Sequence, residues 1–516
     1  MAHDLPARLN VAEIFLARPA REHPGRLAIL GEPRPFTYAE LAALAGRVAG
    51  ALSASGCRPG DRILIVLPDS AEFIAAFFGA TMIGAIAVPV NSGARPSDYA
   101  YYLADSGARF AIVHADALEP VLEMRSAGVL ENVIVVGKTP EEKGSIQVAA
   151  WDDWLAAAQP ITETADTAST DTAFFLYTSG SGGTPKAAVH RHRDMAVANT
   201  CYAQGILGLT PQDRTFSVSK LFFAYGLGNG MYFPLGAGAS TILCPGRPRP
   251  EMVAQIVARF HPTVFFAVPT FYGALLAETE RGLAADFSSV RLAVSAGEPL
   301  PAEIFERFRD RFGTEILDGI GSTEMLHIFL SPRPGRTRAG SCGCEVPGYS
   351  ARIVDDEGQP VPCGTIGNLW VRGDSAFAGY WNKPELTAQT KRGEWVCTGD
   401  KFVQDADGFF HHCGRADDMM KVRGMWVAPA EVENVLLAHP AIAEAAIIGR
   451  SFDGLVRPVA YIVLREGQGS PELAGALRDF LRDRLPSHKI PAEFHFVPNL
   501  PKTATGKIQR FRLREP

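Results

Sequence analysis

Short apolar runs alternate with helix-like runs through the first 140 residues, and this alternation restricts the fold more than any other feature. The run ILIVL at residues 63–67 is continuously apolar, as expected of a parallel strand buried on both faces. A helix-like run begins near Ser70, and further strand-like runs occupy residues 87–90, 109–113 and 132–136. Strands that alternate with helices favour an α/β fold with a mostly parallel sheet.

Local signals refine this pattern. Thr37, followed three residues later by Glu40, predicts a capped helix that begins within FTYAEL at 36–41. Residues 140–169 are polar and weakly patterned, which predicts a surface connection. Strand-like runs return at 263–268 and 290–294, so the α/β pattern extends well past the middle of the chain.

Beyond Gly340 the strand-like runs become shorter, with Asp, Gly and Pro between them, which predicts a small antiparallel subdomain. Thr398-Gly399-Asp400 and the segment 405–410 are predicted to form hairpin turns. A helical run follows at 429–439, and residues 445–516 have a β, helix, β pattern. These last elements predict a small C-terminal domain.

Composition excludes several classes of function. A chain of 516 residues with a net charge of −6 has no basic tract for nucleic-acid binding and is long enough for two or more units. The first residues lack the basic and apolar regions of a secretory signal. The apolar run 73–90 is interrupted by Gly79, Gly84 and Pro89, so it predicts buried elements and no membrane span. Eight scattered cysteines form no CxxC pair, which indicates reduced thiols in a cytoplasmic protein.

The stretch YTSGSGGTPKA at 177–187 is the strongest chemical signal. It follows the apolar run AFFL at 173–176 and combines glycines and hydroxyls with Lys186. Close backbone approach at glycines, hydroxyl donors and one ammonium group suit a polyphosphate. The alternative is an ordinary Ser/Gly-rich surface loop. A Walker A loop is excluded because Pro185 precedes the lysine and Ala187 follows it.

Four other features each have a structural alternative. His190 and His192 are candidates for a metal site or for a solvated helix entrance. The run VSKLFFAYGLGN at 218–229 offers flat apolar contacts for a ring, or it is a helix entering the core. The segment SAGEPL at 295–300 follows a strand, where open α/β sheets bind ligands. Glu324 is a natural Mg²⁺ ligand beside a nucleotide, or part of a strand-to-loop junction.

Taken in order, these motifs resemble the adenylate-forming superfamily of acyl- and aryl-CoA ligases, peptide-synthetase adenylation domains and luciferases. The series comprises the loop with Lys186, Gly297-Glu298-Pro299, GSTE at 321–324, Thr398-Gly399-Asp400, GRADD at 414–418 and PKTATGK at 501–507. The resemblance covers essentially the whole chain, and KLFFAYGLGN at 220–229 is most similar to the benzoate-CoA ligase branch.

The resemblance implies an α/β fold with a large N-terminal adenylation domain, residues 1–416, which combines mostly parallel sheets flanked by helices with a small β subdomain. A small, mobile α+β lid, residues 417–516, would follow a hinge at Asp417. The implied reaction has two steps, with ATP, Mg²⁺ and coenzyme A. The acid's carboxylate attacks the α-phosphate of ATP, and the coenzyme A thiol then attacks the acyl-AMP. No protein nucleophile is required, which agrees with the lack of an obvious Ser-His-Asp set.

Roles carry over by motif. The β- and γ-phosphates would be held by Thr178, Ser179, Gly180, Ser181, Gly182, Gly183, Thr184 and Lys186. Adenine would be lined by Gly297, Glu298, Pro299, Asp318, Gly319 and Ile320. Thr323 would contact the α-phosphate, Glu324 would hold Mg²⁺ and Asp400 would accept both ribose hydroxyls. Arg415 would lie beside the ribose or phosphate.

The resemblance also assigns the moving parts. Lys507 would bridge the carboxylate and the α-phosphate in the first step. After rotation about Asp417, the stretch from Lys421 to Gly424 would line the pantetheine tunnel. Two positions depart from the family pattern: Gly182 stands where threonine is usual, and Ala187 where glycine is usual. The missing threonine hydroxyl predicts weaker ATP binding and an unchanged class of reaction.

The acid pocket is predicted to favour a planar ring, because small and flat residues mix in it. Its candidates are Lys220, Phe223, Ala224, Tyr225, Gly226, Ala296, His327 and Ile328. Lys220 is a partner for the incoming carboxylate or a surface lysine, and His327 is a donor to a ring hydroxyl or amino group or simply a wall. Benzoate, hydroxybenzoate and aminobenzoate all stay open as substrates.

Three alternatives to a ligase that uses free coenzyme A stay open. They are transfer to a separate carrier protein, a non-catalytic nucleotide sensor, and, more distantly, luciferase-type oxidation. The partners expected are a small aromatic acid, no nucleic acid and no membrane, for a monomer or homodimer in the cytoplasm.

Overall fold

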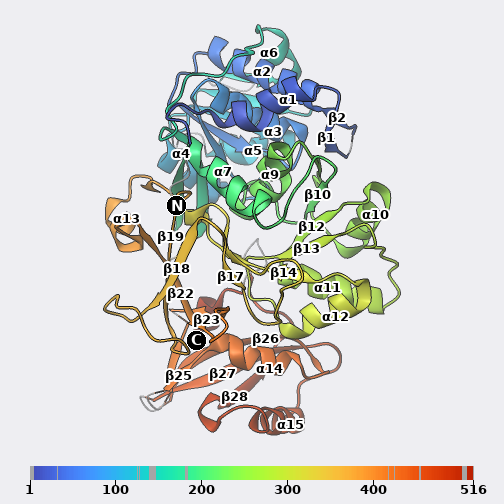
Figure 1. Cartoon of the computed structure of the whole chain (residues 1–516), viewed down its shortest axis with the longest axis vertical. Helices are drawn as coiled ribbons and strands as arrows, with labels where there is room; N and C mark the ends of the chain where they lie inside the picture. Colours follow the sequence, from blue (N-terminus) through green and yellow to red (C-terminus); the bar gives the residue numbers. More distant parts are fainter. Residues whose placement is uncertain are drawn as a thin grey trace.

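The computed structural model describes residues 5–31, 33–124, 126, 128–138, 147–179, 184–416, 418–422, 425–452, 455–502 and 508–514. Figure 1 shows the first part of the chain at one end of the long axis and the C-terminal elements at the other. Two large sheets, with helices packed on them, form the N-terminal part. The architecture is therefore α/β with mostly parallel sheets and a smaller C-terminal unit, as the sequence predicted.

The first sheet has the strand order β20-β9-β8-β4-β3-β5-β6-β7. Strands β8, β4, β3, β5, β6 and β7 are parallel, whereas β9 and β20 are antiparallel to their neighbours. The bounds are β3 Arg62–Val66, β4 Ile86–Pro89, β5 Phe110–His114, β6 Asn132–Val136, β7 Gln147–Ala150, β8 Thr172–Ser179, β9 Pro185–Arg191 and β20 Gly379–Tyr380. The buried apolar runs that predicted strands form the centre of this sheet, where both faces exclude water.

The second sheet has the order β14-β13-β12-β10-β11-β1-β2, and only the β1–β2 pair is antiparallel. Its bounds are β1 Leu27–Leu30, β2 Phe36–Thr37, β10 Arg214–Ser217, β11 Ser240–Ile242, β12 Val264–Ala267, β13 Leu292–Ser295 and β14 Ile316–Asp318. The carboxyl ends of β12, β13 and β14 meet at one edge, which is where open α/β sheets place their ligands.

Helices cover these sheets, and their starts follow the capping signals. Thr37 and Glu40 form the predicted capping box of α2, and the Ser70 side chain caps α3. The helices are α1 Arg18–Glu22, α2 Tyr38–Ala54, α3 Ala71–Met82, α4 Pro96–Ser106, α5 Ala115–Glu123, α6 Trp151–Ala156, α7 His192–Ala198, α8 Ala224–Leu227, α9 Phe233–Gly236, α10 Pro250–Phe260, α11 Pro269–Glu280, α12 Ala302–Phe312 and α13 Pro384–Thr390. Among the described residues, we find no helix with the length and apolar character that crossing a bilayer requires.

Antiparallel strands follow the two large sheets, as the shorter runs predicted. One sheet orders β18-β19-β22-β21, with β23 paired to β22, and a smaller one orders β15-β16-β17. Their bounds are β15 Ile320–Gly321, β16 Ile328–Ser331, β17 Cys344–Glu345, β18 Tyr349–Val354, β19 Gly367–Gly373, β21 Lys391–Arg392, β22 Trp395–Gln404 and β23 Phe410–Arg415. The predicted turn at 405–410 does join β22 to β23.

The C-terminal unit has its own apolar core, made by residues from Met420 onward. Two long antiparallel strands, β26 and β27, carry β28 on one edge. The bounds are β24 Met420–Val422, β25 Met425–Val427, α14 Pro429–Leu437, β26 Ile442–Phe452, β27 Leu455–Leu464, α15 Pro471–Arg482, β28 Glu493–Phe496 and α16 Arg510–Arg514. A separate core supports a separate unit, while the boundary after residue 416 stays a prediction.

Two expectations about local structure are wrong. Residues 140–169 are not simply a surface connection, because β7 and α6 lie within them and Trp151, Trp154 and Leu155 are buried. Thr398-Gly399-Asp400 is not a turn but part of the long strand β22. In both places the contacts that decide the structure come from residues distant in sequence, namely α2 for α6 and β19 for β22.

Candidate active site

The phosphate-loop candidates that the structure describes lie where strand β8 ends and its antiparallel partner β9 begins. Thr178 and Ser179 end β8, and Lys186 follows at the start of β9, directly opposite Thr178 in the register. Thr184 is exposed at the bend before β9. The chain therefore returns along the sheet as β9 before helix α7 begins at His192. Gly180, Ser181, Gly182 and Gly183 lie outside the described residues.

Lys186, Glu324 and Tyr380 come from three distant segments and meet at this strand end. The Tyr380 hydroxyl donates to Oε1 of Glu324 at 2.5 Å, and the Lys186 ammonium lies 3.4 Å from the same hydroxyl. Burial lowers the pKa of Lys186, the nearby Glu324 carboxylate opposes that effect, and the Arg415 cation adds to it. A cation for phosphate and a carboxylate for a metal ion are therefore neighbours. Tyr380 was not a sequence candidate.

The turn that carries Thr323 and Glu324 is held by its backbone. The Phe377 N–H donates to the Glu324 carbonyl at 2.7 Å, and Nε2 of His190 lies 2.8 Å from the Thr323 carbonyl. Nδ1 of His190 faces the Asp194 carboxylate at 3.1 Å, and both side chains are fully buried. The buried His190 ring therefore links the Thr323 carbonyl to the Asp194 carboxylate and holds the turn in place.

These contacts answer the question about the two histidines. His192 is buried, and its Nδ1 accepts the Val11 N–H at 3.2 Å. Neither the metal pair nor the solvated helix entrance is therefore correct, since both rings are buried and engaged separately. Across the parts of the chain that the structure describes, no three His, Cys, Asp or Glu side chains gather as a metal cage would require.

The adenine candidates lie at the carboxyl ends of β13 and β14. Ser295 and Asp318 are register partners at the ends of these strands, and Ala296 and Gly297 follow directly. Glu298 accepts a hydrogen bond from the Thr270 hydroxyl at 2.6 Å, and Pro299 follows it. Ile320 begins β15, just past Gly319. The predicted set is thus brought to one sheet edge, and its contact with a base remains a prediction.

Asp318 predicts a pH effect on stability. Burial raises the pKa of this carboxyl from 3.8 to about 8. Folding therefore takes up a proton, so the stability present below pH 4 is lost as the pH rises toward 8. We expect Asp318→Asn to raise the melting temperature relative to the wild type by about 3–6 °C at pH 8.5. At pH 4 the difference should vanish. A constant difference across this range, in thermal scans without ligand, would contradict the assignment.

Asp400 and Arg415 face each other across β22 and β23. They are register partners, and Nη1 of Arg415 lies 3.1 Å from Oδ1 of Asp400. The side chain of Asp400 is mostly buried, which leaves a carboxylate in a shallow, cation-flanked position. This is the kind of acceptor that two adjacent ribose hydroxyls would suit.

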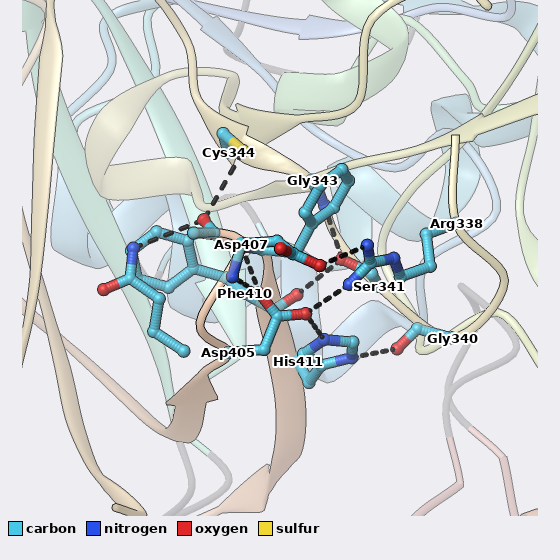
Figure 2. Close-up of polar contacts among 12 residues, drawn as sticks. Arg338, Gly340, Ser341, Gly343, Cys344, Asp405, Asp407, Phe410 and His411 are labelled. Carbon is cyan, nitrogen blue, oxygen red and sulfur yellow. Dashed lines mark hydrogen bonds and ion pairs between the residues drawn. The ribbon is translucent and has the colours of Figure 1, made fainter. Parts of the chain in front are cut away.

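The hairpin that carries this pair is anchored at its turn. Figure 2 shows Arg338 donating to Asp405 and Asp407, at 2.6 and 2.8 Å, while His411 connects Asp405 to the Gly340 carbonyl. The His411 hydrogen bond lowers the pKa of Asp405 to about 2. The contacts fix the turn at 405–409 to the segment before β17, and so they position Asp400 and Arg415.

The acid-pocket candidates also converge. Ala224, Tyr225 and Gly226 lie in α8, directly after Phe223, and the Tyr225 hydroxyl donates to the Val294 carbonyl of β13 at 3.2 Å. His327 packs against the Tyr225 ring at 5.6 Å, and Ile328 begins β16. A Cβ at Gly228 would lie 2.5 Å from the His327 ring, so only glycine admits the imidazole here.

His327 is a neutral acceptor. Its Nε2 lies 3.1 Å from Oδ1 of Asn229 and 3.4 Å from the Tyr225 carbonyl, so this nitrogen carries the proton. Burial lowers the pKa of His327 to about 3. Nδ1 is buried without a hydrogen-bond partner among the described residues. Nδ1 is therefore the ring nitrogen with an unused acceptor, whereas the sequence suggested a donor or a wall. Asn229, which fixes the tautomer, was missed.

Lys220 requires a correction. Its ammonium donates to the carbonyls of Cys244 and Gly246 and lies 3.4 Å from the buried Asp69 carboxylate. These protein acceptors use its donors, so Lys220 is neither a partner for an incoming carboxylate nor a free surface lysine.

Most residues assigned to the hinge and to the moving C-terminal domain lie outside the described residues. Asp417, Gly424 and Lys507 lie beyond the described residues, and of Lys421 only the backbone, in β24, is described. On either side of 503–507, Lys502 and Ile508 form an isolated antiparallel bridge, and the Gln509 N–H donates to the Pro501 carbonyl at 2.8 Å.

Known proteins match the whole chain. The family described as AMP-binding enzyme matches residues 16–381, and the AMP-binding enzyme C-terminal domain matches residues 431–507. Benzoate–CoA ligase of Thauera aromatica is 41% identical over 516 residues, with 99% of this chain and 96% of that protein covered.

Solved structures agree with this result. The anthranilate CoA ligase AuaEII in complex with anthranoyl-AMP has a TM-score of 0.94 at 40% identity, covering 99% of this chain and 98% of that one. A benzoate CoA ligase from Burkholderia xenovorans LB400 has a TM-score of 0.90 at 42% identity, covering 98% and 100%.

Proposed function

The chain belongs to the AMP-binding enzyme family, and we propose that it activates an aromatic carboxylic acid with ATP and transfers it to coenzyme A. The products are an aryl-CoA thioester, AMP and pyrophosphate. Two groups of residues carry the proposal: Lys186, Glu324 and Arg415 interact at one strand end, and the ring of His327, three residues beyond Glu324, packs against Tyr225. The first group suits an anionic nucleotide, and the second suits a planar ring.

In the first step a carboxylate oxygen attacks the α-phosphorus of ATP, and the bond to pyrophosphate breaks. We assign Lys186, with the residues from Thr178 to Thr184, to the β- and γ-phosphates, and Thr323 to the α-phosphate. Asp400 holds the ribose, with Arg415 beside it, and the edge from Gly297 to Pro299 with Asp318 to Ile320 holds the base. The protein's work is placement and charge stabilisation.

Glu324 fits Mg²⁺. Its carboxylate is partly exposed, Tyr380 holds Oε1, and no contact described for the chain uses Oε2. Mg²⁺ commonly takes one or two protein carboxylates and completes its shell with phosphate oxygens and water. When bound, it supplies neutralisation of the polyphosphate charge.

In the second step the thiol sulfur bonds to the acyl carbon, the bond to AMP breaks, and the thiol proton is released. We assign Asp417 as the hinge between domains 1–416 and 417–516. Rotation there would withdraw Lys507 and bring the segment from Lys421 to Gly424 to the pantetheine path.

We further propose that His327 favours rings with a donor substituent. A buried acceptor without a partner costs about 1–3 kcal/mol, which a ring hydroxyl or amino group would recover. We expect His327→Leu to lower kcat/KM for hydroxy- or aminobenzoates by about 10- to 100-fold and for benzoate by less than about threefold. His327→Asn retains an acceptor and should recover much of the loss. Equal losses for all acids in steady-state assays would contradict this role.

A panel of ring-substituted benzoates tests the reaction. We expect ATP–pyrophosphate exchange that depends on the acid, and thioester formation with free coenzyme A. Exchange without thioester would favour loading of a separate carrier protein. Silence across the panel with retained ATP binding would favour a nucleotide sensor, and light emission would favour luciferase-type oxidation.

We also propose that the protein is located in the cytoplasm. None of the eight cysteines, all of which lie among the described residues, is assigned to a disulfide, which supports the reducing cytoplasm. A monomer or homodimer that needs neither membrane nor nucleic acid stays a prediction.

A further inference from the structure

We propose that Tyr380 is a positioning residue for the activation step, which keeps Lys186 and Glu324 apart so that each meets its own part of the nucleotide–metal complex. The inference rests on the proposed function. The Tyr380 hydroxyl lies between the two charges, 2.5 Å from Oε1 of Glu324 and 3.4 Å from the Lys186 ammonium. Among the described contacts, no direct ion pair joins Lys186 to Glu324.

Tyr380 is also held by contacts that do not involve the side chains of Lys186 and Glu324. It lies in β20 opposite Ala188 of β9, and its N–H donates to the Thr387 hydroxyl at 2.9 Å. Its ring meets the edge of Phe377 at 4.8 Å, and the side chain is buried. The Phe377 N–H in turn holds the Glu324 carbonyl. Backbone pairing and ring packing therefore hold Tyr380 in place, in addition to the contacts that its hydroxyl makes with the two charged side chains.

The chemistry of the Tyr380 hydroxyl suits a residue that keeps Lys186 and Glu324 apart. An ordinary phenol is protonated at neutral pH, so the Tyr380 hydroxyl donates its proton to the Glu324 carboxylate. The Lys186 ammonium also lies 4.6 Å from the centre of the Tyr380 ring, a favourable cation–π distance. Without the hydroxyl, opposite charges in a partly buried site attract directly. A Lys186–Glu324 pair would then compete with phosphate and metal.

Tyr380→Phe removes only the hydroxyl and leaves the ring on Lys186 and Phe377. The matched control is Tyr99→Phe, since Tyr99 is also buried and donates one hydrogen bond, to the Asn91 carbonyl at 3.0 Å, within the α4 region. In the full chain we expect Mn²⁺ binding with α,β-methylene-ATP, followed by electron paramagnetic resonance, to weaken about 10-fold in Tyr380→Phe and to stay unchanged in the control.

The half-reactions separate positioning from folding. Acid-dependent pyrophosphate exchange should fall about 10- to 100-fold in Tyr380→Phe, while thioester formation from supplied aroyl-AMP should stay within about twofold. In a Glu324→Gln background the same change should cost less than about threefold, because Tyr380 then has no carboxylate to position. Unchanged Mn²⁺ affinity, additive losses in the two variants, or equal losses in both half-reactions would overturn the proposal. Absence of exchange in the wild type would instead overturn the proposed function, and the Mn²⁺ measurement would still decide the role of Tyr380.

Discussion

Replacement of Lys507 by alanine is expected to lower acyl-AMP formation by about 10²- to 10³-fold while leaving thioester formation from supplied aroyl-AMP within about twofold. The first step brings a carboxylate against a phosphate, and one ammonium between them offsets the repulsion of two anions. The second step has no such encounter, because the acyl-AMP carbonyl is attacked by a thiol. Rapid-quench assays of each half-reaction make the comparison.

The described residues next to Lys507 belong to the C-terminal unit. Lys502 and Ile508 form an isolated antiparallel bridge, and Lys502 pairs with Glu444 of β26 at 2.8 Å. Arg482→Ala is the control, because Arg482 is an exposed cation of the same unit whose described ion pair, with Asp479, lies on the surface of α15. Equal loss of both half-reactions in Lys507→Ala would show that this lysine does not serve one step alone.

Arg510→Met is expected to destabilise the C-terminal unit by about 3–5 kcal/mol. The guanidinium lies 2.8 Å from both oxygens of Glu433, and Glu433 also accepts the Ile447 N–H at 2.7 Å. Asp418, next to the proposed hinge, lies 3.6 Å from Arg510 and 2.5 Å from Arg514. Removing Arg510 leaves the Glu433 carboxylate, whose side chain is 10% exposed, without its cation.

Hydrogen exchange of β26 and β27 measures this effect locally. Protection there should fall in Arg510→Met, whereas β3 and β5 in the first sheet should keep theirs. Arg482→Met, which breaks an exposed pair with Asp479, should cost less than about 1 kcal/mol. Unchanged protection of β26 in Arg510→Met would mean that this ion network does not stabilise the unit.

Local sequence patterns predicted most of the elements of the fold. Thr37 and Ser70 cap their helices because a hydroxyl near a free N–H needs no distant partner. Continuous apolar runs became buried parallel strands for a similarly local reason. Contacts with distant residues explain the wrong predictions. The segment 151–156 is helical because Trp151 and Trp154 are buried against other elements, and Asp400 lies in a strand because β23 pairs with it and β19 pairs with the residues of β22 on either side of it.

The residues of the candidate site also fall into two groups, those that local motifs predicted and those that depend on contacts between distant segments. Motif residues such as Lys186, Glu324 and Asp400 were found because the resemblance assigns roles position by position. Tyr380 was missed because its role depends on the pairing of β20 with β9, which brings together residues nearly two hundred positions apart. Lys220 was assigned wrongly because its partner Asp69 lies far away in the sequence. No local sequence pattern predicts contacts between residues so far apart in the chain.

Oxygen labelling tests the central claim most directly. With a benzoate labelled by ¹⁸O in both carboxylate oxygens, together with ATP, Mg²⁺ and coenzyme A, attack on the α-phosphorus followed by thiol attack on the carbonyl must leave one carboxylate oxygen on the nucleotide. We predict AMP that carries one ¹⁸O and thioester that retains the other. Unlabelled AMP, or label in inorganic phosphate with ADP as the product, would contradict an acyl-adenylate and the account built on it.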